Sequence, residues 1–225
     1  MRRAAATVVC LLAMGGCADD RVVLSRGPLG PASYTVTFDV SGEVALAAET
    51  VSADLDVAPT DDGAVLRLAI ADDEPIIAEL RRTDDGRLSL ETVQSVSPPS
   101  AGETDLAALV GQLDPPLADA PVRIGDEWAS VRRIATGTVE AELRTQLRLV
   151  RFARVGGDDS AVLQGGVSGT LRTTTPSGTF TGRVSGSTEM AWVLDPGRLA
   201  ASETTLRWNI EGAGEVEIRT RVAPG

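Results

Sequence analysis

Residues 139–150 read VEAELRTQLRLV, and apolar side chains alternate along them with charged or polar ones. A period of two places one set on each face of an extended strand, so this stretch predicts an antiparallel β-strand with one buried and one solvated face. The same alternation runs from Tyr34 to Val40 and recurs in three later stretches, at residues 180–194, 206–210 and 216–222. The chain is therefore expected to be mostly β-sheet.

The segments between these strands carry turn signals. Asp-Gly or Pro-Gly pairs end Asp61–Gly63, Asp84–Gly86 and Asp195–Gly197, and glycine supplies the positive φ angles that tight turns require. One helix is expected from Thr104 to Leu113, where Leu106, Leu109, Val110 and Leu113 follow a helical spacing and Asp114-Pro115-Pro116 ends it. Strands longer than ten residues favour a curved antiparallel sheet or an open half-barrel.

Composition excludes many functions. The 225 residues suffice for one sizeable core, but none of them is His or Lys, so all 21 basic residues are Arg. Histidine-based triads, histidine metal ligands and Schiff-base lysines are thereby ruled out. A formal net charge of −11 with scattered Arg disfavours binding of nucleic acid. We therefore expect a protein that is not an enzyme and that needs no cofactor.

The N-terminus predicts export. Residues 1–16 combine Arg2 and Arg3 with an apolar run and two glycines, as a secretory signal does, and the run is too short to span a bilayer. Met14-Gly15-Gly16-Cys17 resembles the bacterial lipobox, which implies a lipid such as palmitate on Cys17 and an anchor on the extracytoplasmic side of the cell membrane or envelope. An ordinary cleaved signal peptide is the alternative. Cleavage takes the charge from −11 to −13.

Three regions follow from this: a signal at 1–16, the lipidated Cys17 with a Pro- and Gly-rich flexible tether at 17–33, and one β-rich domain at 34–225. A faint repeat, in which Gly86-Arg87-Leu88 echoes Gly197-Arg198-Leu199, leaves a duplication open. The Asp pairs lie in expected turns, lack the loop spacing of an EF-hand and indicate solvated turns rather than a metal site.

One expected strand has gaps on its buried face. Glycines interrupt the inward-facing side chains of residues 180–192, which leaves either space for an apolar ligand or room for strand coiling and close packing. The candidate cavity residues are Phe180, Gly182, Val184, Gly186, Met190 and Trp192. Trp128 is expected either to cover a core edge or to face a partner.

Two resemblances bear on function. The stretch Pro121–Trp128, with Pro115-Pro116 before it and the hairpin from Trp192 to Glu203 after it, resembles a family of uncharacterised actinobacterial secreted lipoproteins, which implies no catalytic residues. In architecture the chain is similar to half-barrel lipoproteins of the LolA, LppX and LprG type, which implies a sheet wrapped around a lipid cavity. Those carriers have a helix before the first strand, whereas here the tether leads directly into Tyr34.

Together these observations predict a lipid-anchored envelope lipoprotein that acts as a binding or carrier module for an apolar or lipid ligand. The alternative is a surface structural or protein-interaction module without a small-molecule ligand.

Overall fold

A computed structural model describes residues 21–26, 32–42, 46–71, 75–83, 87–94, 109–136, 139–175, 178–211 and 214–225. The predicted signal, Cys17, the Thr104 cap and the Asp84–Gly86 turn lie outside these residues. The strands are β1 (Ala32–Gly42), β2 (Leu46–Thr60), β3 (Gly63–Ala71), β4 (Ile76–Thr83), β5 (Arg87–Gln94), β6 (Glu127–Thr136), β7 (Val139–Val155), β8 (Asp158–Thr175), β9 (Gly178–Val193), β10 (Arg198–Ile210) and β11 (Gly214–Pro224). A short helix covers residues 109–113.

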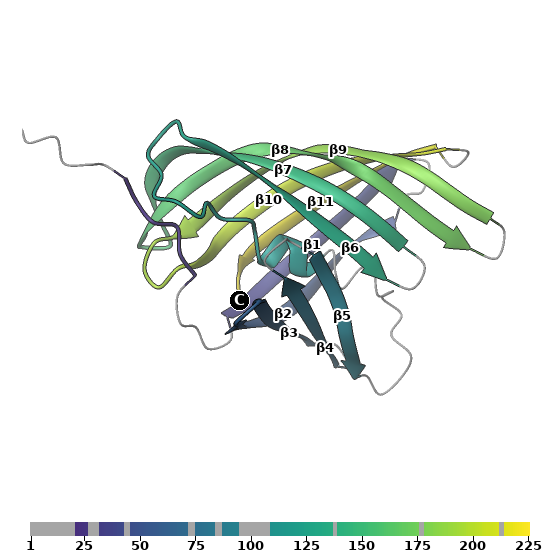
Figure 1. The fold of residues 1–225 in the computed structure, drawn as a ribbon, viewed down its shortest axis with the longest axis horizontal. Helices are drawn as coiled ribbons and strands as arrows, with labels where there is room; N and C mark the ends of the chain where they lie inside the picture. Colours follow the sequence, from purple (N-terminus) through teal and green to yellow (C-terminus); the bar gives the residue numbers. More distant parts are fainter. Residues whose placement is uncertain are drawn as a thin grey trace, which may run out of the picture.

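The fold is all-β with one short helix, as expected, but the sheet closes on itself (Figure 1). The order around the barrel is β1-β11-β10-β9-β8-β7-β6-β5-β4-β3-β2. The expected curved antiparallel sheet or open half-barrel is therefore wrong. Alternation shows where strands lie and not which strands pair, and the closing pairs join segments far apart in sequence: Tyr34 on β1 lies opposite Pro224 on β11.

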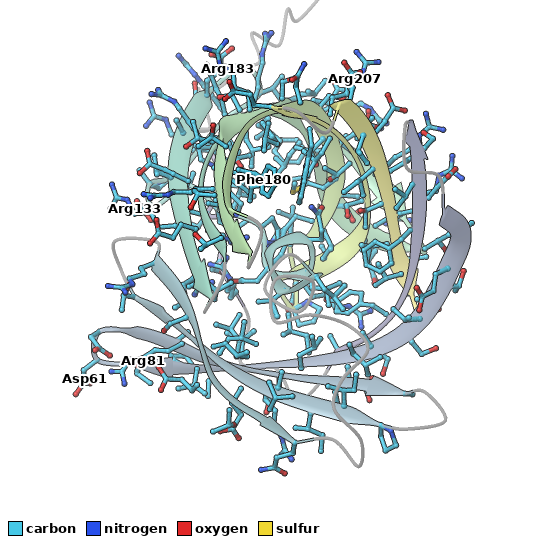
Figure 2. All side chains as sticks on the ribbon, turned by 90° about the vertical axis from the view of Figure 1, so that its right-hand side faces the viewer. Asp61, Arg81, Arg133, Phe180, Arg183 and Arg207 are labelled. Carbon is cyan, nitrogen blue, oxygen red and sulfur yellow. The ribbon has the colours of Figure 1, made fainter. Side chains whose placement is uncertain are left out.

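Closure with eleven strands requires one parallel pair, because strands that simply alternate in direction close only in even numbers. That pair is β5 and β6, which match over three positions from Arg87–Arg133 to Ser89–Ala135. The chain must therefore return from the end of β5 to the opposite end of the barrel before β6 begins. The helix at residues 109–113 belongs to this return and lies inside the barrel (Figure 2).

Glycines allow strong curvature over β7–β10. A Cβ on Gly186 would lie 2.0 Å from the carbonyl oxygen of Thr205 on β10, and one on Gly169 would lie 2.1 Å from that of Glu142 on β7. Such separations are impossible for a real side chain, so these strands approach closely only because glycine stands there. The side chains of Leu206 and Leu143 occupy the adjoining space.

The core fills the inside of the barrel. Leucines dominate its most buried positions, among them Leu66, Leu80, Leu149 and Leu163, each 0% exposed. The helix contributes Leu109, Val110 and Leu113, which are also buried. The helix thus acts as a plug that fills the lumen, and we use the term plug for residues 109–118.

A short N-terminal segment docks at one end of the barrel. Residues 21–26 fall within the stretch expected to be a tether; there Val22 and Val122 exchange backbone hydrogen bonds of 2.7 and 2.8 Å, and Leu24 is 3% exposed. We call this the proximal end, where β1 begins and β11 ends. The distal end carries the β7 start, the β8 end and the β9 start.

Candidate functional site

A cluster of one carboxylate and three guanidinium groups holds the plug in place. Asp114, directly after the helix, is 2% exposed. Arg26 of the docked N-terminal segment donates from Nε to Oδ1 at 2.6 Å, and Arg82 of β4 donates to Oδ2. Arg132 of β6 donates to the Asp114 carbonyl at 2.7 Å. We call these four residues the Asp114 cluster. It joins four parts of the chain: the docked N-terminal segment, β4, the end of the helix and β6.

The same cations satisfy the end of the helix. The last carbonyls of a helix have no partner within it, and Arg132 donates to the Gly111 carbonyl at 2.9 Å. Arg26 also donates to the Pro115 carbonyl at 2.6 Å, and the indole of Trp128 donates to that of Pro116 at 3.2 Å. Because the prolines cannot continue the helix, the chain here depends on side-chain donors from the wall.

Burial and charge compete at Asp114. Burial alone would raise the pKa of this carboxyl, but the attraction of Arg26, Arg82 and Arg132 outweighs it and holds the pKa below its ordinary value. Burial lowers the pKa of Arg26 and of Arg132, which Asp114 partly offsets. Asp114 therefore stays ionised at neutral pH, with both oxygens occupied, and is poorly suited to act as a general base.

A cavity of about 100 Å³ remains between the plug and the wall formed by β6–β10. We call it the lumen cavity. Its walls carry apolar side chains together with a few polar ones. The apolar lining is Ala141, Leu143, Val167, Leu171, Val184, Met190, Leu206 and Trp208, and the polar lining is Gln112, Ser130, Arg132, Thr145, Thr188 and Thr204.

One donor in this wall has no acceptor. The indole nitrogen of Trp208 is buried and lacks a hydrogen-bond partner. Thr188 and Thr204, by contrast, satisfy each other across β9 and β10 at 2.9 Å. A buried N–H without a partner costs free energy, so an acceptor that reached the indole nitrogen of Trp208 would be stabilised there.

A second cavity of about 100 Å³ lies on the other side of the plug, toward the proximal end. We call it the end cavity. Arg26, Arg82 and Asp114 line it together with Tyr34 and Trp192. Burial raises the pKa of Tyr34, although Arg198 opposes the shift, and the phenol is neutral at pH 7. Plug residues thus line two small cavities, Gly111, Gln112, Pro115 and Pro116 the lumen cavity and Leu113 and Asp114 the end cavity.

The six cavity residues expected from the sequence fall in different places. Val184 and Met190 line the lumen cavity, whereas Trp192 lines the end cavity and donates to the Ser25 carbonyl at 3.3 Å. Phe180 is half-buried at the distal mouth (Figure 2). Gly186 faces the backbone of β10 at close range, and Gly182 belongs to a depression on the outer surface.

The Asp114 cluster is not among the sites expected from the sequence. Asp114 is expected there only to end the helix, and Arg82 and Arg132 are not among the expected site residues. A signal was present, because Arg82 continues the inward parity of Ala78 and Leu80 on β4. Trp128, for which two roles were open, covers the plug by its bond to Pro116.

The described interior combines guanidinium, carboxylate, hydroxyl and indole groups. Within the described ranges, no three His, Cys, Asp or Glu side chains are grouped to hold a metal ion. Among the same residues, no helix is long and apolar enough to cross a membrane. The Arg, Thr and Trp side chains can donate hydrogen bonds, and the Asp114 carboxylate accepts them.

Fold and interior together define an all-β protein whose closed eleven-stranded barrel holds a helical plug. No family model, no curated protein and no solved structure matches the chain. The two resemblances drawn from the sequence therefore stay predictions.

Proposed function

We propose that this protein is a non-catalytic binding module that holds a small, largely apolar ligand in the lumen cavity, and that a lipid on Cys17 keeps it at the extracytoplasmic face of a membrane. The observation that carries the binding role is the mostly apolar cavity, whose wall includes Trp208, a residue with a buried and unpartnered indole nitrogen. A ligand with an apolar body and one acceptor, such as a carbonyl or ether oxygen, complements that wall.

Cavity size narrows the ligand class. Small-molecule sites usually enclose about 300–1,000 Å³, whereas the lumen cavity has about 100 Å³. An engineered apolar cavity of about 150 Å³ is known to take up benzene. We therefore expect a ligand, or the end of one, no larger than a short branched alkyl group or a single ring. A whole acyl chain would require the plug to leave the lumen.

The test uses residues 18–225, which retain every strand and the docked segment. Native mass spectrometry before and after organic extraction reports any bound ligand, and small probes such as ethers and aryl ketones are titrated against tryptophan fluorescence. Val184→Phe fills the lumen cavity, while Ser185→Phe places the same group on the exposed face of the same strand. We expect probe binding to be lost in the first variant and retained in the second.

Equal binding by both variants would place the ligand elsewhere, and a protein that takes up no probe would remove the binding role. The alternative, a protein-interaction module, draws on an open depression of about 1060 Å³ on the outer face of β6–β10, where Arg133 pairs with Glu142 at 3.0 Å. A photo-crosslinking residue substituted for Thr170 or Thr181 in this depression tests the alternative. It would capture a partner protein if the chain is an interaction module and would capture none if the chain only binds a small ligand.

A further inference from the structure

The large apolar side chains that remain exposed in the described residues are Val23, Ile124 and Phe152, with exposed fractions of 60%, 55% and 39%. Single exposed apolar residues are ordinary on protein surfaces. These three, however, come from three separate parts of the chain: the docked N-terminal segment, the link before β6 and the last residues of strand β7. All three lie at the proximal end.

Backbone contacts tie their segments together. The backbone N–H groups of Val22 and Val122 each donate a hydrogen bond to the other residue's carbonyl oxygen. The Gly125 N–H donates to the Leu149 carbonyl at 2.8 Å. Val23, Ile124 and Phe152 thus stand on neighbouring segments around one opening of the barrel. At the distal end the corresponding large apolar residue, Phe180, is half-buried and turned toward the barrel interior (Figure 2).

The short separation in sequence between Cys17 and the proximal end limits how far this end can lie from a membrane. Arg21 follows Cys17 by four residues, which span at most about 14 Å when fully extended. If Cys17 carries a lipid, as the proposed function holds, the proximal end cannot lie farther than this from the bilayer surface. The apolar residues therefore lie within reach of the membrane that the anchor selects.

We propose that the proximal end is a membrane-seating surface, with Val23, Ile124 and Phe152 inserted into the interfacial layer of the bilayer. The lipid layer offers an apolar environment to groups that are otherwise exposed to water. Seating in this way also directs the end cavity toward the lipid, because that cavity lies at the same end of the barrel.

The charges of the protein favour contact of the proximal end with the apolar part of the bilayer over contact with anionic lipid headgroups. Two of the cations near this end are paired, Arg123 with Asp126 at 3.5 Å and Arg154 with Asp159 at 3.1 Å. The chain as a whole carries −11, which opposes approach to an anionic surface. Attachment should therefore be insensitive to salt and should not require acidic lipid.

The first measurement is cosedimentation of residues 18–225 with phosphatidylcholine vesicles, with and without phosphatidylglycerol. This form lacks Cys17, so the surface is tested without the lipid. The variant combines Ile124→Asp and Phe152→Asp, and the control is Ala48→Asp, an exposed residue near the distal end of β2. Circular dichroism confirms that all forms fold.

We expect the wild type and the control to partition alike, the double variant to lose at least about tenfold in partition coefficient, and 1 M NaCl to change nothing. The proposal is overturned if the double variant binds as well as the wild type, if the wild type does not bind, or if binding requires phosphatidylglycerol and disappears in salt. A dimer in analytical ultracentrifugation that the same substitutions dissociate would identify a second copy as the occupant instead.

A second measurement uses the full lipidated chain in its membrane. Phe152→Trp should add a fluorescence component that brominated phosphatidylcholine quenches, whereas Thr179→Trp at the distal end should not be quenched. Equal quenching of both would contradict the proposal. Probe binding in the lumen cavity is unaffected by any of these results, so the seating surface and the proposed ligand role can fail separately.

Discussion

Replacing Asp114 by Asn should be among the most destabilising single changes in this protein. The carboxylate is 2% exposed and faces three guanidinium groups, and its loss leaves them without their counter-charge inside the barrel. Breaking a buried ion pair by removing one partner costs about 3–5 kcal/mol. For a domain of this size, that corresponds to a fall in melting temperature of roughly 10 °C.

The comparison that isolates burial is Asp62→Asn. Asp62 also pairs with an arginine, Arg81, at 2.6 Å, but both side chains are exposed, at 58% and 44%. Solvent and salt weaken such a pair, so we expect almost no change in stability. Urea unfolding followed by tryptophan fluorescence measures both variants. A loss below about 1 kcal/mol for Asp114→Asn would refute the idea that the cluster holds the plug.

The lowered pKa of Asp114 predicts that the free energy of unfolding falls at acid pH. Because the pKa of Asp114 is lower in the folded protein than in the unfolded chain, its contribution is fully present above the unfolded value of about 3.9 and is lost as the pH falls toward the folded value. Wild type should lose stability below about pH 4, and Asp114→Asn should lack this component of the decline.

Three further changes test other parts of the structure. Gly186→Ala should lower the free energy of unfolding in urea by about 2 kcal/mol or more, because its Cβ would lie 2.0 Å from the Thr205 carbonyl oxygen. The control Gly166→Ala, whose Cβ would have its nearest neighbour at 3.8 Å, should change that free energy by no more than about 0.5 kcal/mol. Equal effects of the two substitutions would contradict the close approach of β9 and β10. Trp208→Phe removes a buried, unpartnered N–H, so stability without ligand should hold or rise slightly in thermal unfolding, while affinity for probes with an acceptor falls and affinity for pure hydrocarbons does not. Cys17→Ser should abolish incorporation of labelled palmitate and release the protein from membranes, and continued labelling would disprove lipidation at this residue.

Much of the strand pattern followed from alternation. The stretch at 139–150 is part of β7, and the long strands expected after residue 139 reach 17 residues in β7 and 18 in β8. The apolar alternation slips by one residue at Glu49-Thr50, and the register between β1 and β2 shifts beside it, since Phe38 lies opposite Glu49 but Val40 lies opposite Leu46. Local periodicity carries this information because each residue's face depends only on its neighbours.

Closure of the sheet into a barrel cannot be predicted from alternation, because it depends on strand pairs that lie far apart in sequence. The parallel match of β5 with β6 involves three positions, and its existence rests on the plug carrying the chain back through the lumen. The glycines were assigned two meanings, and for Gly186 the structure shows the close approach of two backbones. A missing side chain looks the same in a sequence whether the space is empty or filled by the next strand.

The Asp114 cluster shows how an interior polar site can still be sought in a sequence. Arg82 follows Ala78 and Leu80 at the parity that points inward, and a charge at such a position is stable only with a buried partner or with solvent nearby. A cationic side chain at an inward-facing position of a strand therefore predicts an acidic partner elsewhere in the chain. Asp114 is the carboxylate that the described structure supplies, and it stands just before two prolines where the helix must end and its carbonyls need donors. Pairing inward-facing cations with acids at helix ends therefore identifies both Arg82 and Asp114 from the sequence pattern.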